Sequence, residues 1–179
     1  MTTEVDFQTI FASLESQSAR LNEASDNANQ SLAAVEARLV RLNIGLELWH
    51  TSPIDSTDST GNLGPHETSS RTVQVLGFAR VDGKWCLAVK PMRLVSGFYE
   101  GDTNCPFENR YLEGPTVPLL KASRATRIAG LAAIPDFLVE IGERMAATVS
   151  ALENAASKLQ PSEGPEPSAP LRVRRIRPA

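Results

Sequence analysis

Apolar and small residues in the first part of the chain recur with alternating steps of four and three, which is the pattern of a heptad helix. One row is Phe7, Leu14, Leu21, Ala28, Val35 and Leu42, and the other is Phe11, Ser18, Ser25, Leu32 and Leu39. No proline or glycine precedes Gly45, so nothing opposes a continuous helix. The pattern predicts a long heptad helix within residues 1–43, about 60 Å long at 1.5 Å per residue.

A second row with the same spacing runs near the other end of the chain. Its members are Ile134, Leu138, Ile141, Met145, Thr148, Leu152, Ala155 and Leu159. Residues 119–160 are therefore predicted to hold C-terminal helices, a short one capped by Ser123 and a longer one that begins at Pro135, since proline suits the first helical position. Two matching rows predict that the long helices pack antiparallel in a coiled-coil-like hairpin.

Between the helices, residues 44–118 show the alternation of a small antiparallel sheet. The strongest signal is Asp82-Gly83, because this dipeptide between alternating apolar residues is typical of a two-residue hairpin turn. It predicts that strand 72–81 pairs with strand 84–91, with Phe78 opposite Leu87. Residues 44–50 are predicted to add a third strand. The predicted fold class is α+β.

Three segments lack these periodicities. Residues 51–71 are rich in serine and threonine and are predicted to be a flexible insertion. Residues 93–118 mix aromatic and acidic residues with turn formers, so they are predicted either to add short strands near 94–99 and 110–112 or to pack as an ordered loop. Any ligand-binding loop is expected there. Residues 161–179 are rich in proline and arginine and predict a disordered tail.

Composition sets the class of protein. The chain has 179 residues, of which 41% are hydrophobic, and a net charge of −3. It has no run of about 18 apolar residues and no basic-then-apolar N-terminus, so neither a membrane span nor a signal peptide is expected. Two cysteines, Cys86 and Cys105, are too few for a disulfide framework. The expected location is the cytoplasm.

Motifs that would indicate catalysis are absent from the sequence. It contains no phosphate-binding glycine loop, nucleophile elbow or paired metal-binding cysteines. His50 and His66 fall at a strand end and in the predicted insertion, where an ordinary surface role is expected. The acidic residues Glu100, Asp102, Glu108 and Glu113 have the character of solvated turns, although they also fit a cation site. We expect no enzyme activity, catalytic residue, metal or cofactor.

The sequence therefore favours a non-enzymatic interaction protein, an adaptor or assembly subunit that acts through the heptad rows. Its partner is expected to be another protein or a second copy of the chain. The predicted contact residues are Phe7, Phe11, Leu14, Leu21, Leu32 and Leu39. The alternative is an accessory nucleic-acid-binding protein that uses basic residues of its tail. These are Arg172, Arg174, Arg175 and Arg177. No contact with a membrane is expected.

Overall fold

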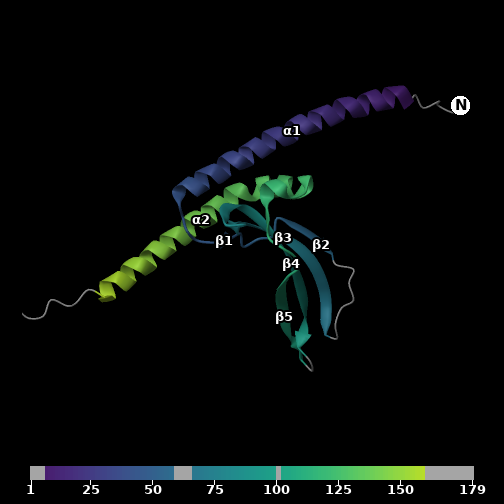
Figure 1. Cartoon of the computed structure of the whole chain (residues 1–179). Helices are drawn as coiled ribbons and strands as arrows, with labels where there is room; N and C mark the ends of the chain where they lie inside the picture. Colours follow the sequence, from purple (N-terminus) through teal and green to yellow (C-terminus); the bar gives the residue numbers. More distant parts are fainter. Residues whose placement is uncertain (1–6, 59–65, 100–101, 160–179) are drawn as a thin grey trace, which may run out of the picture. The chain divides into compact units, whose positions relative to one another are not determined.

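The structure, a computed structural model, describes residues 7–58, 66–99 and 102–159 (Figure 1). The elements are α1 (Phe7–Leu42), β1 (Leu48–Trp49), β2 (Asp55–Asp58), β3 (Glu67–Val81), β4 (Lys84–Tyr99), β5 (Asp102–Leu112), β6 (Val117–Pro118), the 3-10 turn η1 (Leu119–Lys121) and α2 (Arg124–Leu159). They divide between two compact units, Met1–Gly142 and Glu143–Ala179. The predicted α+β class is confirmed.

The β3–β4 hairpin forms the centre of the sheet. Its turn residues, Asp82 and Gly83, have φ values of 50° and 79°. Positive φ at both central residues gives a turn whose twist matches that of the flanking strands. Phe78 lies opposite Leu87, so the predicted register is confirmed. Both strands continue well beyond the predicted bounds.

The sheet is antiparallel throughout, with the order β1-β3-β4-β5, and β2 and β6 add to β3 and β4. Within the stretch predicted from 44 to 50, only Leu48–Trp49 forms a strand. β2 and the start of β3 fall within 51–71, which was predicted to be flexible. β2 pairs with β3, and the start of β3 pairs with the end of β4. This pairing satisfies backbone groups in a way that local composition does not reveal. The predicted tail, 161–179, lies outside the described residues.

The main core lies on the face of the sheet that carries the bulky side chains. Leu76, Phe78, Leu87 and Val89 are buried on this face. α1 and η1 contact β4, and α1 and the first part of α2 lie on one side of the sheet (Figure 1). Leu119 of η1 completes this core. Burial of these side chains is the main stabilising contribution to the first unit.

The opposite face carries small residues under one large ring. Ala79, Cys86 and Ala88 are buried there, and Trp49 packs against them. A Cβ at Gly77 would overlap the ring of Trp49, so glycine is what lets the ring lie flat on β3.

α2 is one helix instead of the two predicted. Ser123 caps it as expected, since its Oγ accepts the backbone N–H of Thr126 at 3.1 Å. Pro135 lies inside the helix and removes one backbone hydrogen bond. Ile134 and Phe137 are buried on either side of it, and this packing keeps the helix continuous.

The predicted coiled-coil hairpin is not confirmed. The buried residues of α1 are Leu32 and Leu39, and α1 packs on β4 and η1. In the part of the chain that the structure describes, no helix has the length and apolar character needed to span a membrane.

Candidate interaction surface

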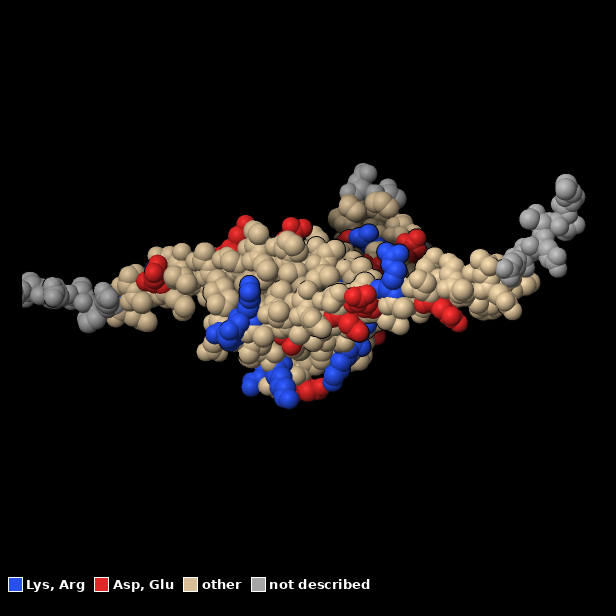
Figure 2. All heavy atoms as spheres, turned by 90° about the horizontal axis from the view of Figure 1, so that it is seen from above, with Lys and Arg blue, Asp and Glu red and all other residues tan. Residues whose placement is uncertain are grey.

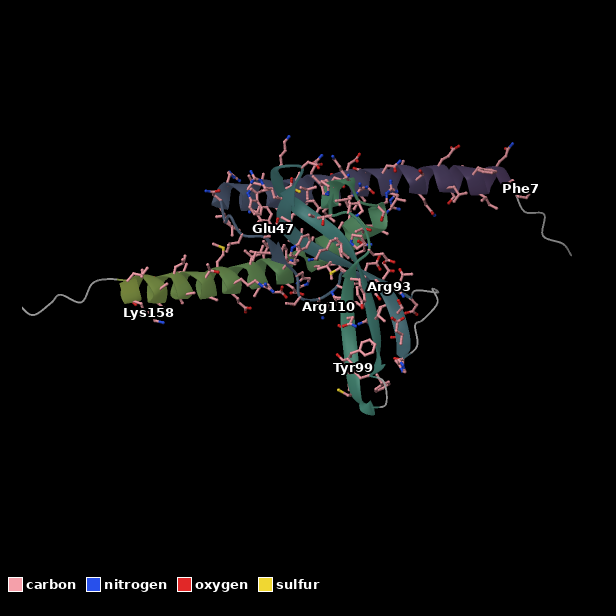
Figure 3. All side chains as sticks on the ribbon, turned by 60° about the horizontal axis from the view of Figure 1, so that its bottom comes forward. Phe7, Glu47, Arg93, Tyr99, Arg110 and Lys158 are labelled. Carbon is pink, nitrogen blue, oxygen red and sulfur yellow. The ribbon has the colours of Figure 1, made fainter. Side chains whose placement is uncertain are left out.

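The first half of α1 exposes the large side chains of both heptad rows. Their exposed fractions are 69% for Phe7, 61% for Phe11, 53% for Leu14 and 49% for Leu21. Phe7 is the first residue of the helix (Figure 3). We call these four residues the exposed rows of α1. A single exposed leucine is ordinary, but four large apolar residues on one helix face form a contiguous stripe.

The same rows are covered in the second half of the helix. Leu32 and Leu39 are 0% and 3% exposed and belong to the core of the first unit. Of the six residues predicted to contact a partner, these two pack within the chain and four remain exposed. Contact of these residues with a partner stays a prediction.

A hydrogen bond to the carboxylate of Glu36 joins the second half of α1 to the sheet. Glu36 Oε2 accepts the backbone N–H of Leu87 at 2.9 Å. Burial raises the pKa of Glu36, and the bond from Leu87 only partly opposes this. β6 covers β4 at Ala88 and Val89, so Glu36 occupies the position on β4 where strand pairing stops.

The change from covered to exposed occurs near the middle of α1. Ser25 and Ala28 are half-buried, and Arg124 Nη2 donates to Asn22 Oδ1 at 3.0 Å. Beyond this bond, toward the N-terminus, lie the exposed rows. Figure 2 shows that this end of the molecule has few charged side chains on the face in view. A weakly charged apolar stripe is suited to apolar packing and is a poor surface for phosphate binding.

The hydroxyl group of Ser25 is satisfied within the helix. Ser25 Oγ donates to the carbonyl of Leu21 at 2.8 Å. Such a bond leaves no free donor for a neighbouring helix to satisfy. Ser25 is small and its hydroxyl is already bonded, so a helix can approach closely at this position without a large desolvation cost.

The sequence did not reveal one polar cluster, at the end of β1. The His50 side chain is 8% exposed, and its Nδ1 lies 3.0 Å from Glu140 Oε1 of α2. Thr51 donates to Glu140 through both its backbone N–H and its hydroxyl. Burial acts to raise the pKa of Glu140, but the bonds from Thr51 and the contact with His50 outweigh it and hold that pKa below its usual value.

This cluster joins β1 to α2 and lacks the arrangement of a catalytic triad. The hydroxyl of Thr51 donates to the carboxylate of Glu140 instead of the imidazole of His50, so the triad order of hydroxyl, imidazole and carboxylate is not formed. The only available sequence signal was a histidine at a strand end, because its partners lie far along the chain.

The two cysteines differ in environment. Cys86 is buried and Cys105 is exposed, and both are free. Burial raises the pKa of Cys86, and the charge of Glu36 adds to this effect. Cys86 therefore stays a neutral thiol instead of a nucleophile. Among the described residues, no group of three or more histidine, cysteine or acidic side chains is placed to hold a metal ion.

Two of the cavities lined by described residues lie on the first unit. One, of about 470 Å³, lies between α1 and the tip of the β3–β4 hairpin and includes Glu36, Trp85 and Lys121. The other, of about 310 Å³, is polar and crosses the sheet from Asp58 to Glu108. In the second, Arg71 and Glu108 approach to 3.9 Å, so the opposite charges face each other.

The predicted anionic-partner residues cannot be placed, because Arg172, Arg174, Arg175 and Arg177 lie outside the described residues. No family model, no curated protein and no solved structure matches the chain.

Proposed function

We propose that the protein is a non-enzymatic assembly or adaptor subunit whose exposed rows of α1 pack against a helix of another protein. The supporting observation is a difference in cover along one continuous heptad pattern. Leu32 is completely buried, whereas Leu14, on the same helix, is 53% exposed. A pattern that is covered by the chain itself at one end and open at the other is typical of a helix completed by a partner.

The residue types favour a helical occupant. Rows spaced by three and four residues accept knobs from a facing helix with the same spacing. Phe7 and Phe11 supply large apolar surfaces, since an aromatic side chain can bury roughly 150–250 Å². Truncation of such anchors commonly accounts for most of the affinity at an interface.

The second half of α2 is a further candidate for coiled-coil packing. Leu152 and Leu159 are 65% and 83% exposed within the second unit. We also propose a more specific arrangement, the predicted antiparallel hairpin. In it, the second half of α2, from this chain or a second copy, packs against the exposed rows of α1. This arrangement makes a different prediction, because residues 7–21 of α1 would then be protected from hydrogen exchange in the purified protein alone.

The test compares two substitutions that add the same charge to the same helix. Leu14→Glu places a carboxylate in the exposed rows, and Ser16→Glu places one on the opposite, exposed face. We expect Leu14→Glu to abolish capture of a partner from source-cell lysate and Ser16→Glu to preserve it. Both variants should show the circular dichroism and melting temperature of the parent, because both sites are exposed.

Equal capture by both variants would overturn the proposal. A captured complex that is lost after nuclease treatment would instead favour nucleic acid, for which the arginine-rich tail is the candidate site. Protection of residues 7–21 in the purified protein alone would assign the exposed rows of α1 to helices of this chain or of a second copy.

A further inference from the structure

β5 is the last strand of the sheet. It pairs with β4 on one side, and no strand in the described parts of the chain pairs with its outer side. Tyr111 and Leu112 are 51% and 64% exposed there. Arg110 lies on this strand, and Tyr99 lies near its far end (Figure 3). An edge of this length offers a row of backbone donors and acceptors to another strand.

The register decides which backbone groups of β5 face outward. Glu113 N donates to the carbonyl of Pro91 at 3.0 Å, so residue 113 turns its backbone groups toward β4. In an antiparallel ladder this orientation alternates, and Phe107, Asn109 and Tyr111 face β4 as well. The outward-facing residues are Pro106, Glu108, Arg110 and Leu112. Proline has no backbone N–H. Because Pro106 faces outward, β5 loses no hydrogen bond to β4 at this position.

The charged residues on this edge, Glu108 and Arg110, are complementary to the same two residues of a second copy. A two-fold axis at Asn109 would set Glu108 opposite Arg110 of a second copy, and the reverse pair would form on the other side of the axis. Both residues turn their backbone groups outward, so each of these positions would also exchange two backbone hydrogen bonds. On the other face of the strand, Phe107 would lie opposite Tyr111 of the second copy. Opposite-charge and aromatic cross-strand pairs both stabilise a sheet.

The neighbouring symmetric registers lack this match. An axis at Glu108 or at Arg110 would place a charged residue opposite its own copy, which is destabilising. A shift of the pairing register by one residue would set the outward-facing backbone groups of one β5 strand against inward-facing groups of the other. The hydrogen bonds of the ladder would then not form. Within one chain, Arg110 Nη2 already lies 3.2 Å from Glu108 Oε1, which confirms that the two side chains share a face.

We propose that β5 pairs antiparallel with β5 of a second copy, centred on Asn109, and joins two sheets into one. This surface is separate from the exposed rows of α1, so the proposal does not depend on the partner of α1. A dimer of this kind carries two copies of those rows and would bind a repeating partner with higher avidity than a single chain.

The test is sedimentation velocity of the full chain with a charge exchange on β5. The parent should be a dimer. Arg110→Glu sets two acids opposite each other at both symmetric positions, and we expect the dimer dissociation constant to rise by roughly 10-fold or more. The double variant, with Glu108→Arg added, restores opposite charges and should return to within about 3-fold of the parent. Because Arg110 also contacts Glu108 within one chain, the circular dichroism and thermal unfolding of both variants are compared with those of the parent, which they should match if the effect lies in the contact between copies.

Arg144→Glu is the matched control, since it makes the same charge change at an exposed position of α2. It should leave the dimer unchanged. A parent that stays monomeric up to roughly 100 μM, or a dimer that Arg110→Glu leaves intact, would overturn the proposal. A dimer broken by Leu14→Glu alone would also overturn it and assign self-association to α1. Partner capture through α1 is read separately with Leu14→Glu and Ser16→Glu, so the two proposals can fail independently.

Discussion

The carboxylate of Glu36 accepts the backbone N–H of Leu87 at 2.9 Å, and this bond joins α1 to β4 next to the short pairing with β6. It gives an otherwise open sheet edge a charged acceptor. Glu36→Ala should lower the free energy of unfolding by roughly 1–3 kcal/mol, because it leaves the Leu87 N–H without its acceptor. Urea unfolding of the parent and the variant measures this difference.

The pH dependence of Glu36 has a definite sign. Burial raises its pKa above 4.5 in the folded chain, so the folded state holds this proton more tightly than the unfolded state does. The resulting stabilisation is present below pH 4.5 and is lost as the pH rises through the folded pKa. Glu36→Gln should remove this loss, so the parent should become less stable relative to the variant as the pH rises.

The control for that experiment is Glu23→Gln, at an exposed position of the same helix. Its unfolding free energy should follow that of the parent at every pH. If Glu36→Gln also followed the parent, burial of the Glu36 carboxyl would not contribute to the pH dependence.

The two halves of α1 should respond differently to truncation. Leu32→Ala removes a completely buried side chain and should lower the free energy of unfolding by roughly 2–5 kcal/mol. Leu14→Ala removes an exposed side chain and should change it by about 0.5 kcal/mol or less. Chemical denaturation of the dilute protein measures both. A large effect of Leu14→Ala would mean that the chain itself covers the exposed rows.

Gly77 should not tolerate a side chain. Gly77→Ala would displace the ring of Trp49, which also lies 4.0 Å from Lys90 Nζ, and should cost roughly 1–3 kcal/mol of stability. In a Trp85→Phe background, the fluorescence of Trp49 should shift to longer wavelength as the ring becomes exposed. Gly142→Ala is the control: its Cβ meets no neighbouring atom within 4 Å, so it should be neutral or stabilising.

Glu140 should stabilise the fold at neutral pH. Its pKa lies below 4.5 in the folded chain, so its contribution is present above pH 4.5 and is lost as the pH falls through the folded pKa. Glu140→Gln should lower the free energy of unfolding by about 1 kcal/mol at pH 7, and the difference should shrink in acid. Glu143→Gln, at an exposed position nearby, should show neither effect. A constant difference at all pH values would contradict this role.

The local signals in the sequence predicted α1 and the β3–β4 hairpin well. Asp82-Gly83 placed the hairpin and its register, because both turn residues must adopt positive φ. The heptad spacing placed α1 to within a few residues. Pro135 misled the prediction of two C-terminal helices, since the burial of Ile134 and Phe137 outweighs the single hydrogen bond that proline removes.

Long-range partners could not be predicted in the same way. Heptad rows predict that one face of a helix is covered, but they do not identify the element that covers it. Leu32 and Leu39 are buried in a helix that packs on β4 and η1. The contact of His50 with Glu140 joins residues that no local pattern relates. The outward-facing charges of β5 became visible only when the register with β4 was known.

The most direct test of the central claim, that the exposed rows of α1 receive a helix of another protein, is site-specific photocrosslinking in source cells. A photoreactive amino acid at position 11 should form one discrete adduct, and the same probe at position 16, on the opposite face, should not form it. Mass spectrometry should map the adduct to an amphipathic helix of the partner. Absence of an adduct at position 11, or the same adduct at both positions, would contradict the claim.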